Sequence, residues 1–184
     1  DLYPGDYVVD IAKKILKKNQ ILNFDNYNLI FNDLKNLSIN EAMNLIKNDL
    51  KTLGIIHDNF VSENYIVNQK LVEKSLNILK DRGYVYEGIL EKPKGNDVDD
   101  WEPRKQILFK STKFGDDTDR ALKKSDGSWT YFANDVAYHL NKIERKFDLL
   151  INVLGADHAG YLKRQASCVA ALSENKQQII SKVC

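Results

Sequence analysis

The chain has 184 residues with 43% hydrophobic and 29% charged side chains, and its formal net charge is +1 at pH 7. This composition is typical of a globular protein of one domain or slightly more. Near-neutral charge excludes the simplest nucleic-acid binder, whose strongly basic surface supplies the affinity. No window approaches the ~18 consecutive apolar residues of a membrane span, and no signal peptide is evident, so we expect a cytoplasmic protein without membrane contact.

The charge is unevenly distributed along the chain. Residues 58–100 carry six basic and nine acidic side chains, whereas residues 101–184 carry fourteen basic and ten acidic ones. The cysteines, Cys168 and Cys184, form no metal-binding spacing and no disulfide framework. We expect Cys168 to fill a helix face.

Helical patterns dominate the first half of the chain. Within residues 1–22, apolar side chains recur at helical spacing after a Tyr-Pro-Gly turn. Residues 38–41, with sequence SINE, have capping-box spacing and predict the start of a second helix, which Gly54 would end. Another helix is expected over residues 69–82, with Gly83 as its terminator.

Strands and helices alternate in the second half. We predict strands at 84–86, 106–110 and 129–131, an exposed loop at 91–103, and a helix through Val136, Leu140 and Ile143. Residues 149–154, with sequence LLINVL, form a nearly continuous apolar run, which is typical of a strand buried on both faces in a parallel sheet. Another helix is expected to begin near residues 158–160. The pattern indicates an α/β fold.

Parallel sheets bind ligands at the carboxyl ends of their strands, and two segments are therefore candidates. Residues 131–135 place an aromatic and a carboxylate four positions apart, where a strand gives way to a helix. Residues 155–160, with sequence GADHAG, follow the apolar strand, but no Lys and Ser or Thr follow them as in a phosphate-binding P-loop. Asp157 could cap a helix, or it could accept from hydroxyls or a cation while His158 donates to phosphate.

Other polar groups make weaker candidates. Residues 116–119, with sequence DDTD, lack the Gly and terminal Glu of a calcium loop. They are better interpreted as a turn whose carboxylates pair with Arg120 or nearby lysines. We expect His139 to pack within a helix, and His57 lies beside a predicted turn.

Four stretches carry a family resemblance: GYVYEG (83–88), DWEPRKQILFKSTKFGDDTDR (100–120), KKSDGSWTYFANDVAYHLNKIERKFD (123–148) and LINVLGADHAGYLKR (150–164). YPGDYVVDIA (3–12) is a further match. With these stretches the chain closely resembles the catalytic region of bacterial arginyl-tRNA synthetases, which are class I aminoacyl-tRNA synthetases. The resemblance is dense over half of the chain and traceable over most of it.

The resemblance implies an α/β fold that is part of a Rossmann-type class I catalytic domain with a connective α+β insertion. On that template, residues 1–57 resemble the exit from the first half of the catalytic domain. Residues 58–120 resemble the connective insertion, and residues 121–184 resemble the start of the second half.

The resemblance also implies site residues. Tyr131 and Asp135 match residues that line the arginine pocket, with Asp135 expected to pair with the guanidinium. Asp157 matches another arginine- or ribose-facing group, and Gly155 and His158 match positions near the ATP ribose. A planar guanidinium favours carboxylate acceptors in a fork geometry that a lysine substrate could not satisfy. No residue is expected to act as a nucleophile, and Mg²⁺ is expected to arrive with ATP rather than at a protein metal site.

The implied function is ATP-dependent activation of L-arginine to arginyl-adenylate and transfer to tRNA(Arg), by a full-length enzyme expected to be a monomer. The sequence departs from the family because it has no His-x-Gly-His motif and no Lys-Met-Ser-Lys-Ser-like loop. We therefore expect a central fragment that is inactive by itself. One alternative is a truncated paralogue that binds tRNA or arginine without ligase activity, and a second is an unrelated α/β nucleotide-binding hydrolase.

Overall fold

The computed structural model describes residues 5–18, 24–91 and 103–184. The chain divides into two units, Asp1–Phe60 and Val61–Cys184. We call them the N-terminal and C-terminal units and describe each by itself.

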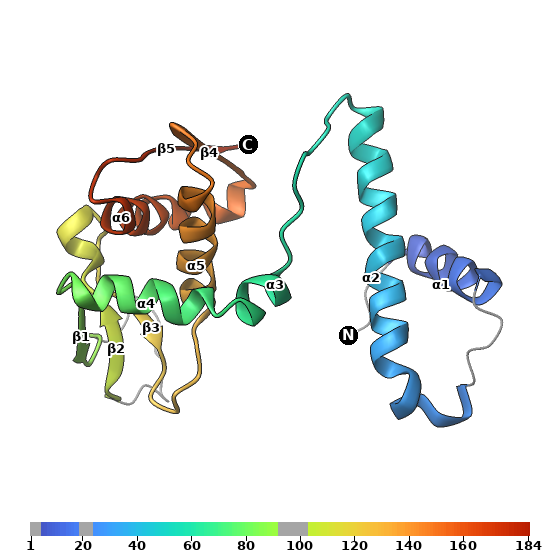
Figure 1. Cartoon of the computed structure of the whole chain (residues 1–184), viewed down its shortest axis with the longest axis horizontal. Helices are drawn as coiled ribbons and strands as arrows, with labels where there is room; N and C mark the ends of the chain where they lie inside the picture. Colours follow the sequence, from blue (N-terminus) through green and yellow to red (C-terminus); the bar gives the residue numbers. More distant parts are fainter. Residues whose placement is uncertain (1–4, 19–23, 92–102) are drawn as a thin grey trace. The chain divides into compact units, whose positions relative to one another are not determined.

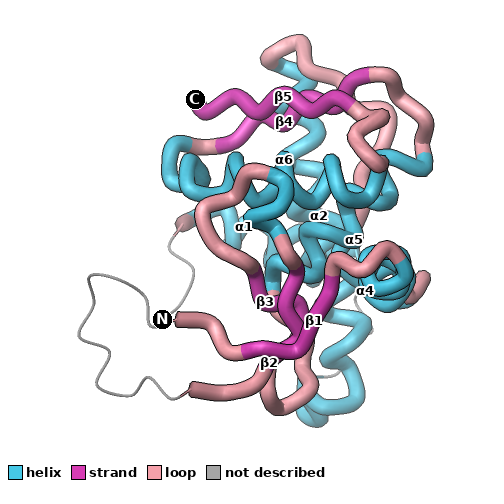
Figure 2. The backbone as a smooth tube through the Cα atoms, turned by 90° about the vertical axis from the view of Figure 1, so that its left-hand side faces the viewer, coloured by secondary structure: helices cyan, strands magenta, loops and turns pink. Residues whose placement is uncertain are grey.

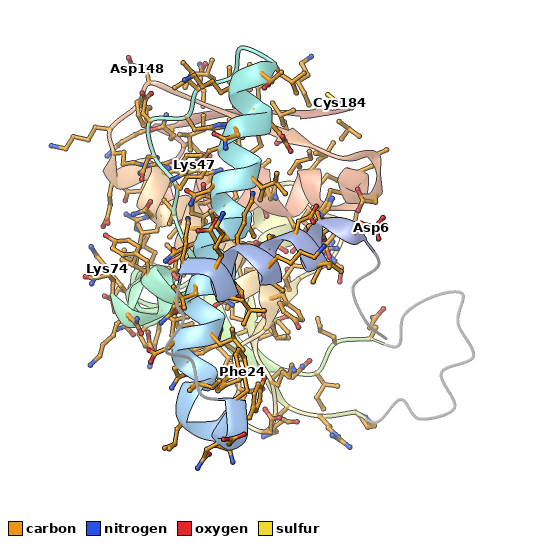
Figure 3. All side chains as sticks on the ribbon, turned by 90° about the vertical axis from the view of Figure 1, so that its right-hand side faces the viewer. Asp6, Phe24, Lys47, Lys74, Asp148 and Cys184 are labelled. Atoms are coloured by element: carbon orange, nitrogen blue, oxygen red, sulfur yellow. The ribbon has the colours of Figure 1, made fainter. Side chains whose placement is uncertain are left out.

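The N-terminal unit pairs a short helix with a long one (Figure 1). Helix α1 spans Asp6–Lys18, as its apolar spacing predicts, and buries Ile11 and Ile15. A 3-10 turn, η1 (Phe24–Asn26), precedes helix α2 (Tyr27–Thr52). Phe24 and Lys47, labelled in Figure 3, mark this turn and the C-terminal half of α2. The Lys18 ammonium lies 2.6 Å from a Glu41 carboxylate oxygen and joins the two helices.

The predicted helix start at residues 38–41 is wrong, because α2 runs through these residues without a break. Partly buried side chains recur at helical spacing on both sides of Ser38, at Ile30, Leu34, Glu41 and Leu45. This continuous stripe outweighs the weak helix propensity of one serine.

The predicted end of α2 at Gly54 is confirmed. Gly54 has a left-handed φ of +74°, and its N–H donates to the Lys51 carbonyl at 3.0 Å. The Ile55 N–H donates to the Leu50 carbonyl at 2.8 Å. These two bonds form a Schellman cap, which satisfies carbonyls that the helix leaves free.

The C-terminal unit begins with helices α3 (Glu63–Asn68) and α4 (Leu71–Asp81). The helix predicted over 69–82 is thus confirmed as α4, which begins two residues later because Lys70 takes a left-handed conformation. Gly83, with a φ of +73°, follows its end as predicted. Strands β1 (Val85–Gly88), β2 (Gln106–Phe109) and β3 (Arg120–Lys123) form an antiparallel sheet in the order β1-β2-β3. The 3-10 turn η2 (Ser111–Phe114) separates β2 from β3.

A strand–helix–strand unit follows. Helix α5 (Tyr131–Glu144) leads to strand β4 (Leu149–Leu154), the 3-10 helix η3 (Ala156–Tyr161), helix α6 (Leu162–Ser173) and strand β5 (Gln178–Val183). Strands β4 and β5 pair in parallel, with Leu149 opposite Gln178 and Leu154 opposite Val183. The predicted parallel strand at 149–154 is confirmed, whereas β3 and β5 were not predicted.

Three local predictions in this unit are wrong. Residues 129–131 are not a strand: Trp129 forms a single bridge to Lys123, and Tyr131 opens α5 because Thr130 caps that helix. Strand β4 is not buried on both faces, since Leu150 and Asn152 are buried whereas Ile151 and Val153 are exposed. Residues 158–160, where an α-helix was expected to begin, lie within the tighter η3, and α6 begins only at Leu162.

The core of the C-terminal unit lies between its helices and the strands around them. Figures 1 and 2 show the two sheets at opposite ends of the unit, with α5 and α6 between them. Leu79, Phe109, Val136 and Cys168 are fully buried there, and Cys168 fills a face of α6 as predicted. The predicted loop at 91–103 lies almost wholly outside the described residues. Within the described ranges, no helix is both long and apolar enough to cross a membrane.

Candidate functional site

A cavity of about 290 Å³ lies where the first turns of α3 and α5 meet. Tyr131 and Asp135 face it together because they lie four positions apart on α5. The cavity is lined by Val61, Ser62, Glu63, Ile66, Tyr131, Asn134, Asp135 and Tyr138. The structure thus brings the two predicted arginine-pocket residues into one space.

Thr130 fixes the start of α5 beneath this cavity. Its hydroxyl donates to the Ala121 carbonyl of β3 at 2.8 Å and accepts from the Ala133 N–H at 3.2 Å. The same side chain therefore caps the helix and ties it to the antiparallel sheet. Tyr131, the first residue of α5, keeps 89% of its surface exposed and stands open to solvent.

The carboxylate of Asp135 has an unusual environment. Among the residues that the structure describes, no hydrogen bond or ion pair to its carboxylate oxygens is found. Burial raises the pKa of Asp135, and the negative charge of Glu63 raises it further, whereas the charges of Arg164, His158 and Lys142 act in the opposite direction. A half-buried carboxylate that faces a cavity in this way is best stabilised by a cationic ligand.

Glu63 is a second acidic group at the cavity, and no sequence pattern predicted it. Its carboxylate accepts a hydrogen bond from the Asn134 amide at 2.7 Å, which joins α3 to α5. Ser62 caps α3, and its side chain accepts from the Tyr65 N–H at 3.1 Å. In the sequence, Ser62-Glu63 has the pattern of an ordinary helix start, so only the fold reveals that Glu63 lies beside Asp135.

Gly155, Asp157 and His158 lie together in a second place, the turn after β4. Gly155 precedes η3 and lies close to Asp157, because a Cβ on Gly155 would be 2.7 Å from an Asp157 carboxylate oxygen. That carboxylate is 3.0 Å from Nδ1 of His158. Asp157 is the second residue of η3, whose N-cap is Gly155, and the N-cap of α6 is Tyr161, so the prediction that Asp157 is a helix N-cap is wrong.

The turn and the cavity have separate linings, although their charges interact. None of Gly155, Asp157 and His158 lines the cavity, yet the charge of His158 acts on Asp135. Arg164 also acts on Asp135, and its guanidinium stacks 4.3 Å from the centre of the Tyr161 ring. Arg164 and His158 therefore lower the pKa of Asp135, whereas Glu63 raises it.

The weaker candidates have structural roles. Arg120 forms two hydrogen bonds with Asp116, at 2.7 and 2.8 Å, and Lys163 pairs with Asp117 at 2.6 Å, which confirms the predicted turn. The Arg120 guanidinium lowers the pKa of Asp116 against an opposing effect of burial. His139 is buried in α5 as predicted, and His57 contacts the Phe60 ring in the N-terminal unit. Across the described residues, no cluster of three His, Cys, Asp or Glu side chains could hold a metal ion.

The chain is similar over its whole length to arginine–tRNA ligases. It is 56% identical over 183 residues to the ligase of Pelagibacter ubique, covering 100% of this chain and 32% of that protein. It is 47% identical over 185 residues to the ligase of Anaplasma phagocytophilum, covering 99% and 31%. No protein-family model matches the chain.

A solved structure agrees with these relatives. The crystal structure of a Campylobacter jejuni protein described as an arginyl-tRNA synthetase matches all of this chain, with a TM-score of 0.76 and 28% identity, over 37% of its own length. The resemblance to arginyl-tRNA synthetases is confirmed. The chain spans about a third of the length of the arginine–tRNA ligases it matches. This likeness does not favour a binding module without ligase activity, nor an unrelated hydrolase.

Proposed function

We propose that this chain forms the arginine-binding part of an arginine–tRNA ligase. The whole protein would activate L-arginine with ATP, giving arginyl-adenylate and pyrophosphate, and would pass the arginyl group to tRNA(Arg). The observation that carries the proposal is the Asp135 carboxylate, which is half-buried at a cavity that also holds Tyr131 and Glu63. The identity of 56% to an arginine–tRNA ligase supports it.

The chemistry of arginine fits this cavity. A guanidinium is planar, always charged and rich in N–H donors, so it can bridge two carboxylates that a compact ammonium would satisfy less well. In the proposed complex Asp135 accepts from the guanidinium, Glu63 supplies a second negative charge, and the Tyr131 ring lies beside the side chain. Substrate binding would exclude water from the cavity, and the lower dielectric would strengthen each of these interactions.

The proposal also includes the domain boundaries, the residues that would face the nucleotide, the metal ion and the oligomeric state. Residues 1–57, 58–120 and 121–184 would be the exit from the first half, the connective insertion and the start of the second half of a Rossmann-type class I domain. Gly155 and His158 would face the ATP ribose, and Asp157 would face the arginine or the ribose. Mg²⁺ would accompany the ATP phosphates, and the cytoplasmic enzyme would act as a monomer.

The decisive experiment is Asp135→Asn in the full-length protein. The measurement is arginine-dependent ATP–pyrophosphate exchange in the presence of tRNA(Arg). Loss of a charge-assisted bond should raise the KM for arginine by about 10- to 100-fold. Asp148→Asn is the matched control because Asp148 is an exposed aspartate in the turn before β4. Equal KM values for the two variants would remove Asp135 from the arginine site.

A further inference from the structure

A buried polar network joins α5, β4 and α6 directly beneath Asp135. Nδ1 of His139 lies 2.8 Å from the Asp135 carbonyl oxygen, and Nε2 lies 3.0 Å from the Asn152 amide nitrogen. The same amide nitrogen donates to the Gln165 side-chain oxygen at 3.0 Å. The Lys142 ammonium donates to the Asn152 side-chain oxygen at 2.8 Å. His139, Asn152 and Gln165 are all less than 10% exposed, at 2%, 6% and 7%.

The direction of every bond in this network is determined by its partners. A carbonyl only accepts, so Nδ1 of His139 carries the proton and Nε2 is an acceptor. Asn152 then uses both amide protons, one toward His139 and one toward Gln165, while its oxygen accepts from Lys142. The network is complete only with a neutral His139, and burial lowers the pKa of this histidine to about 4.

The network holds both flanks of the turn that contains His158. Asn152 lies on β4 shortly before the turn, and Gln165 lies in the first turn of α6 after it. His139 ties both to α5, one turn of helix after Asp135. A polar network of this kind is geometrically exact, since a small shift of one element would leave buried donors unpaired.

We propose that His139 and Asn152 are positioning residues, which hold the first turns of α5 in register with the turn formed by residues 155–161. This inference rests on the proposed function. The two groups held in register would be Asp135, which would bind the arginine guanidinium, and His158, which would face the ATP ribose. Neither positioning residue touches a substrate. Their task is to keep the two substrates at a reacting distance, where a misplacement of about 1 Å can cost about 100-fold in rate.

The test is His139→Leu in the full-length protein, assayed by arginine-dependent exchange. Leucine fills much of the space but accepts no hydrogen bond. Because Asp135 is intact, we expect the KM for arginine to change by less than about threefold while kcat falls at least about tenfold. His139→Gln keeps an acceptor for Asn152 and should recover most of the lost kcat. Gln165→Met, which removes one acceptor, should lower kcat in the same way and replaces His139→Leu if that variant does not fold.

Arg82→Met provides the control for a merely structural loss. Arg82 donates two hydrogen bonds, at 2.7 and 2.8 Å, to the Ala171 and Leu172 carbonyls at the far end of α6. Its loss should lower the Tm without changing kcat. If His139→Leu and Gln165→Met keep the kcat of Arg82→Met, or if His139→Gln recovers nothing, the positioning role is overturned while the proposed function stands. Absence of arginine-dependent exchange in the wild-type protein would overturn both.

Discussion

At the scale of single residues, the cavity depends on two acids from distant parts of the chain. Glu63 and Asp135 are seventy-two positions apart, yet Glu63 raises the pKa of Asp135 across the cavity. Repulsion between them destabilises the empty site, and a bound cation would relieve it. A cationic ligand would therefore gain affinity from two sources: its new hydrogen bonds, and relief of the repulsion between the Glu63 and Asp135 carboxylates.

Glu63→Gln tests this pairing. The substitution removes one negative charge, so the pKa of Asp135 should fall and arginine should bind more weakly. In the full-length protein we expect the KM for arginine to rise about 3- to 30-fold, a smaller effect than for Asp135→Asn. Glu73→Gln is the matched control because Glu73 is an exposed glutamate in the first turn of α4. A KM unchanged from that of the control would show that Glu63 does not contact the substrate.

His139 predicts a pH dependence of stability for the chain itself. Its folded pKa of about 4 lies below the unfolded value of 6.5, so the unfolded state binds more protons between these values. The unfolding free energy is therefore complete above about pH 6.5 and falls as the pH decreases toward 4. At pH 5 the loss should be about 2 kcal/mol relative to pH 7.5.

Urea unfolding of the wild type and His139→Gln at both pH values measures this effect. Lys142 on the same helix also disfavours a charged His139, and the partners from β4 and α6, Asn152 and Gln165, do not titrate. Asp135 contributes with the opposite sign, but it is present in both proteins and cancels in the difference. If His139→Gln loses as much stability at pH 5 as the wild type, the histidine is not the titrating group.

At the scale of elements, the N-terminus of α5 depends on one hydroxyl. Thr130→Val keeps the shape of the side chain but removes both the cap on Ala133 and the bond to the Ala121 carbonyl. We expect the unfolding free energy of the chain to fall by about 1–2 kcal/mol, whereas Thr130→Ser should cost much less. Urea unfolding checks both variants. Equal losses for valine and serine would show that packing of the threonine methyl, and not the hydroxyl, holds the helix end.

The elements that sequence patterns predicted well are those with a strong local signal. Helix α4 has apolar spacing and a glycine after its end, and β4 is a nearly continuous apolar run. Strands β3 and β5 were missed because RALK and QIISKV become strands only through pairing with β2 and β4. The start of α2 was predicted at the wrong place because the capping-box pattern of residues 38–41 also occurs within helices, where the serine caps nothing.

The residues of the candidate site likewise include some with a local sequence signal and some without one. Tyr131 and Asp135 could be predicted as neighbours because they lie one helical turn apart, and both line one cavity. Their contact with arginine stays a prediction. Glu63 lies in an ordinary helix start, and Asn152 lies in an apolar strand. Their importance comes from neighbours more than ten residues away, at Asn134 and His139, which no local pattern contains.

At the scale of the whole molecule, the two units differ in what they bury. The large core cluster lies entirely within residues 61–184, as do the cavity and the polar network. In the described part of the N-terminal unit, Ile11 and Ile15 are the buried apolar side chains. Buried apolar surface is the main source of stability, so the C-terminal unit should carry most of the unfolding free energy of the chain.

Residues 61–184 expressed alone should therefore fold. We expect one cooperative thermal transition with a Tm within a few degrees of that of the whole chain, and the same decrease of stability below about pH 6.5 from His139. Residues 1–60 alone should show helical circular dichroism that melts gradually, because a helix pair with so small a core lacks a cooperative transition. Calorimetry on residues 61–184 and circular dichroism on residues 1–60 test these two expectations. A non-cooperative 61–184 would mean that the N-terminal unit supplies contacts essential to the core.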